Sequence, residues 1–350
     1  MTRRGASLTI YDIAKSASVS PKTVSRVINR NPQVGAELRD RVNKAIEELG
    51  YEPNLSARAL KGPRGYTLAM LTHPELVEPP EDDDWFLVPY IGALEAAALR
   101  TAQQYGYRFL VEGVHLDAEA MARDLSRYQR RQIDGVVLVP PVCDDAGLLD
   151  ALAARAIPSV RISPGIAPER GATISIDERG GARAATEHLL GLGHRRIAMI
   201  SGPSDHGAAT ARVDGFRDAM AGVGDAWEPP IVQGDFLPAS GYRITGDLLD
   251  RAEPPTAIFA ANDGMAAGVI AAGIDRGLRL PRDLSVVGFD DTDAARYTWP
   301  PLTTVRQPLT LMAREAIELL SAMVDGLSDA PARVQLDHRL VVRKSTCPPL

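Results

Sequence analysis

The sequence predicts an α/β fold: a small N-terminal helix-turn-helix unit followed by a two-lobed body built on parallel sheets. Two short helical patterns, separated by only a few residues, make up the opening stretch "YDIAKSASVSPKTVSRVIN" at residues 11–29. From Tyr66 onward, short apolar runs alternate with amphipathic stretches, an order typical of parallel sheets. With 350 residues, 45% of them hydrophobic, the chain is long enough for two or three packed units.

Apolar residues recur at helical spacing in three segments near the N-terminus. They are Ile10, Ile13, Ala14 and Ala17 in the first, Val24, Val27 and Ile28 in the second, and Leu38, Val42, Ala45, Ile46 and Leu49 in the third. Ser20 is placed to cap the second helix, and Pro21 suits its first position because the missing N–H would have no partner there. The third helix is expected to cover the other two and to end at Gly50.

One face of the second predicted helix is basic. Lys22 and Arg26 lie four residues apart with Thr23 and Ser25 beside them, and such a face carries the donors that guanine edges and phosphates accept. Residues 1–62 carry 11 Lys/Arg against 6 Asp/Glu, whereas the rest of the chain carries 28 against 39, so only the N-terminal part suits a polyanion. A solvated basic helix in a bundle is the alternative. The complete three-helix unit favours a helix-turn-helix whose second helix enters the major groove of DNA.

Several classes of protein are excluded by composition. Two cysteines, Cys143 and Cys347, are too few for a disulfide framework. The sequence contains no run of about 18 apolar residues, the length that a membrane span requires. The stretch "MTRRGASLTIYD" lacks the apolar core of a signal peptide, so we expect a cytoplasmic protein. The six histidines are scattered and show no metal-ligand spacing, so we expect neither a metal nor a cofactor.

The body contains two series of predicted strands. The first is "YTLAMLT", "YRFLVEG", "IDGVVLVPP" and "IPSVRIS", with helical patterns at 89–105, 118–131 and 145–155. The second is "RRIAMISGP", "PTAIFAAND" and "LSVVGFDD", with helical patterns near 178–192, 208–222, 239–251 and 262–276. Two such series predict two lobes with a cleft between them, and ligands of such sheets bind at the carboxyl ends of the strands.

Polar residues gather where a ligand would bind. Asn262 and Asp263 end one predicted strand, Asp290 and Asp291 end another, and Arg212 follows a third. Capping of the following helices is the alternative for these Asp and Asn residues. We expect a ligand role for Arg212, Asn262 and Asp290, because three loops then bring planar polar groups to one cleft, as sugar recognition requires.

An apolar sugar face also needs an aromatic partner. Phe236 and Trp299 are candidates, although either could instead belong to the core.

The N-terminal stretches "TIYDIAKSASVSPKTVSRVIN" and "AIEELGYEPNLSARALK" resemble the headpiece of the lactose/galactose repressor (LacI/GalR) family. The resemblance implies that Pro21, Lys22 and Arg26 read bases. It implies phosphate-positioning roles for Thr9, Ser20, Thr23, Ser25, Asn29, Tyr51 and Asn54. The family usually has Gly where this chain has Ser18, and Ser near the start of the third helix where this chain has Gly35.

Residues 54–62, "NLSARALKG", contain good helix formers but are too short to form a helix alone. They read either as an ordinary linker or, by the resemblance, as a hinge helix that folds when two subunits meet on DNA. In that case Ala57 and Leu60 contact DNA, and Leu60 wedges into the minor groove. The implied domains are a headpiece at 1–53, a hinge at 54–63 and an effector-binding and dimerisation domain at 64–350.

The body resembles the same family almost to its C-terminus, through blocks such as "PPTAIFAANDGMAAG" and "DLSVVGFDDTDAARYTWPPLTTVRQPL". This implies a body like that of periplasmic binding proteins, with effector contacts from Arg212, Asn262 and Asp290 and a stacking aromatic at Phe236. Ser163 replaces an acidic sugar contact of the lactose repressor, and Arg161 is nearby, so hydroxyl selection is expected to differ. "VLVPPVCD" and "PSVRIS" are similar to members that respond to plant-derived sugars. Residues 74–90 read as a lid or as a solvated loop.

An enzyme is the main alternative function, because "DDTD" at 290–293 could hold a metal or act as acid and base. No phosphate loop, complete G-x-G-x-x-G or serine elbow accompanies it.

We therefore expect a repressor of carbohydrate uptake or catabolism genes that binds a pseudo-palindromic operator and responds allosterically to a sugar effector. A homodimer is expected because one headpiece reads half a site, and the tail "STCPPL" lacks the heptad leucines of a tetramerising extension.

Overall fold

A computed structural model describes residues 8–28, 34–51, 64–77, 88–223, 227–327 and 332–350. The chain divides into two compact units, Met1–Tyr66 and Thr67–Leu350. None of the helices in these ranges is long and apolar enough to cross a bilayer.

The first unit contains three helices, α1 Ile10–Ser16, α2 Pro21–Ile28 and α3 Ala36–Leu49. Thr9 and Asp12 form a capping box at the start of α1. At the start of α2 the hydroxyl of Ser20 accepts a 3.0 Å hydrogen bond from the backbone N–H of Thr23, which confirms the predicted cap. Gly50 ends α3 in the left-handed conformation with φ 62°, also as predicted.

The three helices enclose one small apolar core. Its buried members are Ile13, Ala14, Ala17, Val24, Val27, Val34, Val42, Ala45 and Tyr51. The prediction that Leu38 and Leu49 help to cover the other helices is wrong, because they are 39% and 37% exposed. Leu38 lies in the first turn of α3 and Leu49 is its last residue, so both stand at the ends of the helix.

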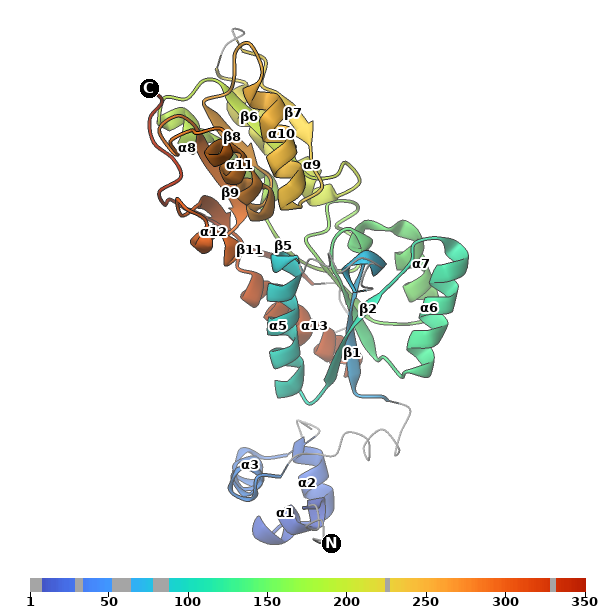
Figure 1. The fold of residues 1–350 in the computed structure, drawn as a ribbon. Coiled ribbons are helices and arrows are strands. Elements are labelled where there is room, and N and C mark those ends of the chain that lie inside the picture. The colour runs from blue at the N-terminus through green and yellow to red at the C-terminus, as the bar shows by residue number, and fades with distance from the viewer. Residues whose placement is uncertain (1–7, 29–33, 52–63, 78–87, 224–226, 328–331) are drawn as a thin grey trace, which may run out of the picture. The chain divides into compact units, whose positions relative to one another are not determined.

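The first lobe of the second unit is a six-stranded parallel sheet in the order β11-β5-β4-β3-β1-β2. Its strands are β1 Thr67–Thr72, β2 Arg108–Gly113, β3 Gly135–Leu138, β4 Ser159–Ile162, β5 Ala172–Ile176 and β11 Arg333–Leu336. Helices α5 Pro89–Gln104 and α13 Leu309–Val324 cover one face, and α6 Ala118–Arg130 and α7 Ala146–Ala154 cover the other (Figure 1). The short 3₁₀ helices are η1 Pro74–Leu76 and η2 Val142–Asp144.

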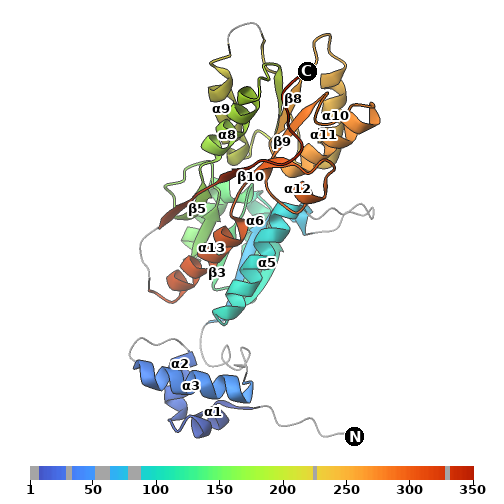
Figure 2. The same cartoon turned by 90° about the vertical axis from the view of Figure 1, so that its left-hand side faces the viewer.

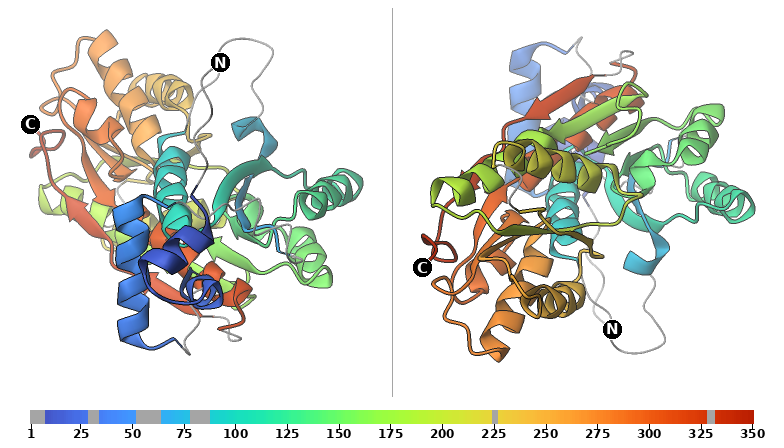
Figure 3. Two further views of the ribbon diagram at one scale, coloured as in Figure 1. Left: turned by 90° about the horizontal axis from the view of Figure 1, so that it is seen from below. Right: turned by 90° about the horizontal axis from the view of Figure 1, so that it is seen from above.

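The second lobe is a six-stranded sheet in the order β12-β10-β9-β8-β6-β7, parallel except for β12 against β10. Its strands are β6 Ile197–Ser201, β7 Ile231–Gln233, β8 Ala257–Ala260, β9 Ser285–Asp290, β10 Thr303–Arg306 and β12 Arg339–Val341. The helices that flank it are α8 Glu178–Gly191, α9 Gly207–Met220, α10 Pro238–Leu249 and α11 Asp263–Asp275, with a short α12 Ala294–Tyr297. The α8–α9 pair and the α10–α11 pair lie on opposite faces of the sheet (Figures 2 and 3).

The prediction of two parallel-sheet lobes is confirmed, but the chain is divided between them in a way that the sequence did not predict. It passes between the lobes three times: from β5 to α8, from β10 to α13 and from β11 to β12. The late helix α13, red in Figure 2, therefore packs beside the early helix α5 in the first lobe. Strands β5, β7 and β10 to β12 were not predicted. Of these, β7, β11 and β12 are partly exposed edge strands that lack a continuous buried run.

Candidate functional sites

The outer face of α2 presents the two basic side chains that were predicted to read DNA. Val24 and Val27 are buried against the other helices, whereas Lys22 and Arg26 are exposed. Pro21 begins the helix. Because the core residues and the basic residues occupy different faces, α2 is free to present its cations without disturbing its packing.

The other predicted headpiece residues differ in their placement. Thr9 takes part in the capping box of α1, and the hydroxyls of Ser20 and Thr23 lie 2.9 Å apart at the start of α2. Tyr51 is 8% exposed and belongs to the core, which the sequence did not predict. The side chain of Ser25, together with Asn29, Asn54, Ala57 and Leu60, lies outside the described residues.

The turn between α1 and α2 is braced from the third helix. Ser18 adopts a left-handed conformation with φ 52°, which costs a non-glycine residue energy. Arg41 donates hydrogen bonds to the carbonyls of Ala17 and Ser18, at 2.9 and 3.1 Å. A serine is thereby held where a glycine would adopt the turn without strain.

A cavity of about 530 Å³ lies between the two lobes of the second unit. From the first lobe it is lined by His73, Glu75, Leu76, Val88, Tyr90, Ile91, Pro140, Pro141 and Ser163, and from the second by Pro203, Asp205, His206, Ala208, Arg212, Asp235, Phe236, Leu237, Asn262 and Asp290. Its volume falls within the range of roughly 300–1,000 Å³ found for small-molecule sites.

Four of the predicted effector residues meet at this cavity: Arg212, Phe236, Asn262 and Asp290. They come from the second turn of α9, the loop after β7, the residues after β8 and the end of β9. These are the carboxyl ends of the parallel strands or the helices that follow them, as the topology predicts. Their contact with an effector stays a prediction.

Arg212 is buried and fixed in position by the second lobe. Its Nε donates a 2.9 Å hydrogen bond to Glu178 Oε2, and another nitrogen donates to the carbonyl of Ala261. Its guanidinium carbon lies 3.8 Å from the ring centroid of Phe289, a favourable cation–π position. A nitrogen of Arg212 is also 3.7 Å from Asp290 Oδ1. The guanidinium is thus positioned before any ligand arrives.

The carboxyl group of Asp290 has a pKa near neutral pH. Burial raises its pKa to about 7, although the Arg212 charge and a 2.8 Å hydrogen bond from Gln307 Nε2 act in the opposite direction. Its backbone has φ 108°, and two other lining residues, Ser163 at 46° and Phe236 at 68°, also have positive φ. Strained backbone of this kind clusters at functional sites, so the three residues mark the cavity independently of the sequence motifs.

His206 is a cavity residue that the sequence did not predict. Burial, with a smaller effect of the nearby Arg212 charge, lowers its pKa to about 4, so the imidazole is neutral at pH 7. Its ring meets that of Phe236 edge-on, with centroids 5.0 Å apart. Its Nδ1 is buried and has no hydrogen-bond partner among the described residues, and a ligand polar group would supply one.

Asn262 caps a helix, the alternative considered above, and its predicted ligand role stays a prediction. Its Oδ1 accepts a 2.8 Å hydrogen bond from the backbone N–H of Met265 at the start of α11, and its Nδ2 donates to the carbonyl of Phe236. One amide group therefore both begins α11 and holds the loop that carries Phe236, and it still lines the cavity.

Two predicted effector residues do not line the cavity. Arg161 is 1% exposed, and all five of its N–H groups are used within the protein, by Asp144 and by the carbonyls of Cys143, Ile166, Ala167 and Arg170. No donor is left for a sugar. Trp299 is 79% exposed and is not among the residues that line the cavity.

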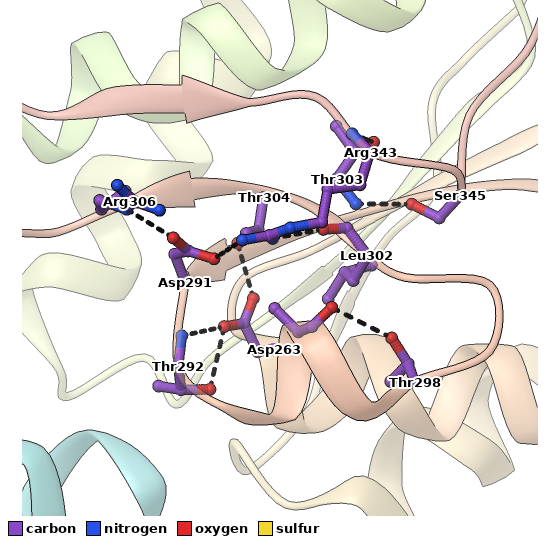
Figure 4. A network of polar contacts seen from close by, with 11 residues as sticks. Asp263, Asp291, Thr292, Thr298, Leu302, Thr303, Thr304, Arg306, Arg343 and Ser345 are labelled. Atoms are coloured by element: carbon purple, nitrogen blue, oxygen red, sulfur yellow. Dashed lines mark hydrogen bonds and ion pairs between the residues drawn. The ribbon is translucent and has the colours of Figure 1, made fainter.

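Asp263 and Asp291 hold the second lobe together and cap no helix through their side chains (Figure 4). Asp263 accepts hydrogen bonds from Thr292 and Thr304. Asp291 forms ion pairs with Arg306 and Arg343, and so attaches the segment after β12 to the loop after β9. Among the described residues, no group of three or more His, Cys, Asp or Glu side chains is arranged to hold a metal ion, and this includes the "DDTD" stretch at 290–293.

Both units match known protein families. The family described as "Bacterial regulatory proteins, lacI family" matches residues 9–54, and the "Periplasmic binding protein-like domain" matches residues 186–346. The chain is 35% identical over 347 residues to the HTH-type transcriptional regulator CelR of Thermobifida fusca, with 96% of this chain and 98% of that protein covered. It is 35% identical over 343 residues to the HTH-type transcriptional regulator DegA of Bacillus subtilis (strain 168), with 97% and 98% covered.

Solved structures resemble the chain over the same length. A complex of the transcriptional regulator CelR with cellobiose has a TM-score of 0.71 and 34% identity, and covers 97% of this chain and 99% of that one. A Lac repressor dimer bound to operator and the anti-inducer ONPF has a TM-score of 0.71 and 29% identity, and covers 98% and 100%.

Proposed function

The chain belongs to the lacI family of bacterial regulatory proteins, and from this premise we propose that it represses genes of carbohydrate uptake or catabolism under the control of a sugar effector. It is a DNA-binding transcriptional regulator with an effector-binding domain, and not an enzyme. Repression, the class of genes and the class of effector are the proposed parts of this function. Because it acts on chromosomal DNA, we expect it in the cytoplasm.

The lining of the cavity is the observation that carries the sugar proposal. The Phe236 ring offers an apolar face, and Arg212, Asn262 and Asp290 offer planar polar groups beside it. Sugars are bound by this combination. A relative with 34% identity is solved with cellobiose, which supports a sugar of similar chemistry here.

The charged groups that line the cavity favour a neutral effector over an anionic one. The described lining carries four carboxyl groups, those of Glu75, Asp205, Asp235 and Asp290, and one guanidinium, that of Arg212. The guanidinium is already paired with Glu178. An anionic ligand such as a sugar phosphate would meet net negative charge along this lining, in which Asp290 is buried and the other three carboxyl groups are exposed, so a neutral sugar or oligosaccharide is favoured.

We propose that residues 74–90 form part of a lid. Leu76, Val88 and Tyr90 line the cavity, whereas 78–87 lie outside the described residues. Burial raises the pKa of Tyr90 further above its ordinary value, so its phenol is neutral at pH 7.

We expect the protein to bind DNA as a dimer. We also expect Tyr297 and Trp299 to lie in the interface between the two subunits. They are 81% and 79% exposed, an unusual environment for large aromatic rings, and a solved relative binds its operator as a dimer. Replacing both by Asp should convert the purified protein to monomers without unfolding it. Sedimentation measures the mass. If the double variant forms a dimer as tightly as the wild type does, the interface lies elsewhere.

Sugar affinity is expected to increase from pH 6 to pH 8. Because the pKa of Asp290 is raised to about 7, its carboxyl is mostly protonated at pH 6 and mostly ionised at pH 8. The ionised form accepts stronger hydrogen bonds from sugar hydroxyls, so affinity should rise about tenfold over this interval. Calorimetry at both pH values measures the change. The Asp290→Asn variant should show no such rise, and stronger binding at pH 6 would contradict the assignment.

The function as a whole is tested by selecting genomic fragments that the purified full-length protein binds, followed by sequencing. Enrichment of a pseudo-palindrome beside sugar-transport or glycosidase genes is the expected result, and those genes would suggest the effector. Enrichment beside unrelated genes would contradict the carbohydrate proposal. Failure to enrich any fragment, with or without added sugars, would contradict the role of α2.

A further inference from the structure

The buried ion pair between Arg161 and Asp144 shapes a loop of the first lobe. The two side chains are 1% and 4% exposed, with nitrogen and oxygen 3.0 Å apart. Asp144 also accepts hydrogen bonds from the backbone N–H groups of Gly165 and Ile166, and Arg161 donates to carbonyls farther along the same loop. Buried pairs contribute little net stability but can specify one geometry. Here the pair fixes the course of residues 163–170.

This loop meets the second lobe backbone to backbone. A methyl group on Gly165 would lie 2.2 Å from Cα of Gly207, and one on Gly207 would lie 2.4 Å from Cα of Gly165 and 2.6 Å from Asp144 Oδ2. Such distances are far inside van der Waals contact. For each glycine the three nearest atoms all belong to the opposite lobe. A side chain at either position would therefore clash first with the opposite lobe, and only while the lobes are this close.

Cavity residues flank the contact on both sides. Ser163, two residues before Gly165, lines the cavity from the first lobe. His206 and Ala208, on either side of Gly207, line it from the second. A ligand that touches both walls therefore lies directly beside the place where the two backbones meet.

The acidic side of the ion pair also suits this contact. Gly207 is the first residue of α9, and its N-cap residue His206 provides no side-chain cap. A helix N-terminus carries partial positive charge, so the Asp144 carboxylate beside Gly207 favours the approach of the two lobes.

We propose that the Gly165–Gly207 backbone contact, held in position by Asp144 and Arg161, is a closure contact that couples occupancy of the cavity to the arrangement of the lobes. The proposal rests on effector binding in this cavity. A ligand that bridges Ser163 and His206 favours the state in which the glycines touch. The ligand shifts the equilibrium only as far as its affinity differs between the two states, and the contact is one of the interactions that make it differ.

Calorimetry on the full-length protein tests the contact, with cellobiose as the first probe. Gly165→Ala and Gly207→Ala should each weaken binding by about tenfold, and the double variant should lose no more than the single ones, because one contact is removed in all three. Gly191→Ala is the control, since a methyl group at that position of α8 meets nothing within 4 Å. Unchanged affinities in the two variants, or losses that add, would overturn the proposal.

A second measurement needs no ligand. In the free Gly165→Ala protein, hydrogen exchange should be faster by about tenfold at Ala209 and Thr210, whose N–H groups donate to the His206 carbonyl at the start of α9. This change is expected although the substitution lies in the other lobe, and Gly191→Ala should leave the exchange rates unchanged. Unaltered exchange in Gly165→Ala would overturn the closure contact even if no sugar binds. Altered exchange together with a wild-type protein that binds no sugar would contradict the proposed effector alone.

Discussion

Replacing Arg26 by alanine is expected to abolish specific operator binding while leaving the fold intact. The side chain is exposed on α2, whereas the residues that hold the helix, Val24 and Val27, are buried. A specific contact between an arginine and a guanine edge contributes about 1–3 kcal/mol. A dimer loses that contact in both half-sites, so affinity should decrease by at least about 30-fold.

The measurement compares operator and random DNA over a range of salt concentrations. Lys44→Ala is the matched control, because Lys44 is an exposed cation of the same unit on α3, 3.8 Å from Glu48. The control should keep the preference for the operator. If Arg26→Ala weakens operator and random DNA equally, Arg26 contacts phosphate only. An unchanged operator affinity would contradict the assignment of α2 as the recognition helix.

The Asp290→Asn variant is expected to bind its operator but to lose its response to sugar. Asparagine keeps the size of the side chain and an acceptor for the hydrogen bond from Gln307, so the buried neighbours stay partnered. It removes the negative charge toward which sugar hydroxyls donate. Hydrogen bonds to charged groups contribute about 1.5–3 kcal/mol, so sugar affinity should fall roughly 10- to 150-fold.

Asp293→Asn is the control for this variant. Asp293 lies in the same loop but is exposed and does not line the cavity, so the substitution should leave sugar affinity unchanged. Calorimetry with the sugar suggested by the bound genes measures both variants, and a gel-shift assay measures release from DNA. Equal sugar affinity in Asp290→Asn and wild type would remove Asp290 from the effector site.

The candidate sites were predicted to different extents. The cavity residues Arg212, Asn262 and Asp290 follow or end predicted strands whose carboxyl ends must meet in a parallel sheet, so their position was predictable from topology. Phe236 follows β7, which was not predicted, and was assigned from the family resemblance. His206 was not predicted, because nothing in the neighbouring sequence indicates that its ring is buried beside Phe236. Arg161 was assigned to the ligand on sequence proximity, but its hydrogen-bond partners lie in two other segments of the chain, at 143–144 and at 166–170.

The sequence by itself determined the helix-turn-helix unit, its basic face, the strand–helix order of the body and the family. These features depend on periodicity, caps and glycine terminators, which act over a few residues, as Ser20 and Gly50 illustrate. Only the tertiary structure decided that α13 joins the first lobe, that Arg161 donates hydrogen bonds within the protein to the loop at 163–170, and that Gly165 contacts Gly207. These arrangements depend on packing between residues far apart in the chain, whose proximity no local pattern encodes.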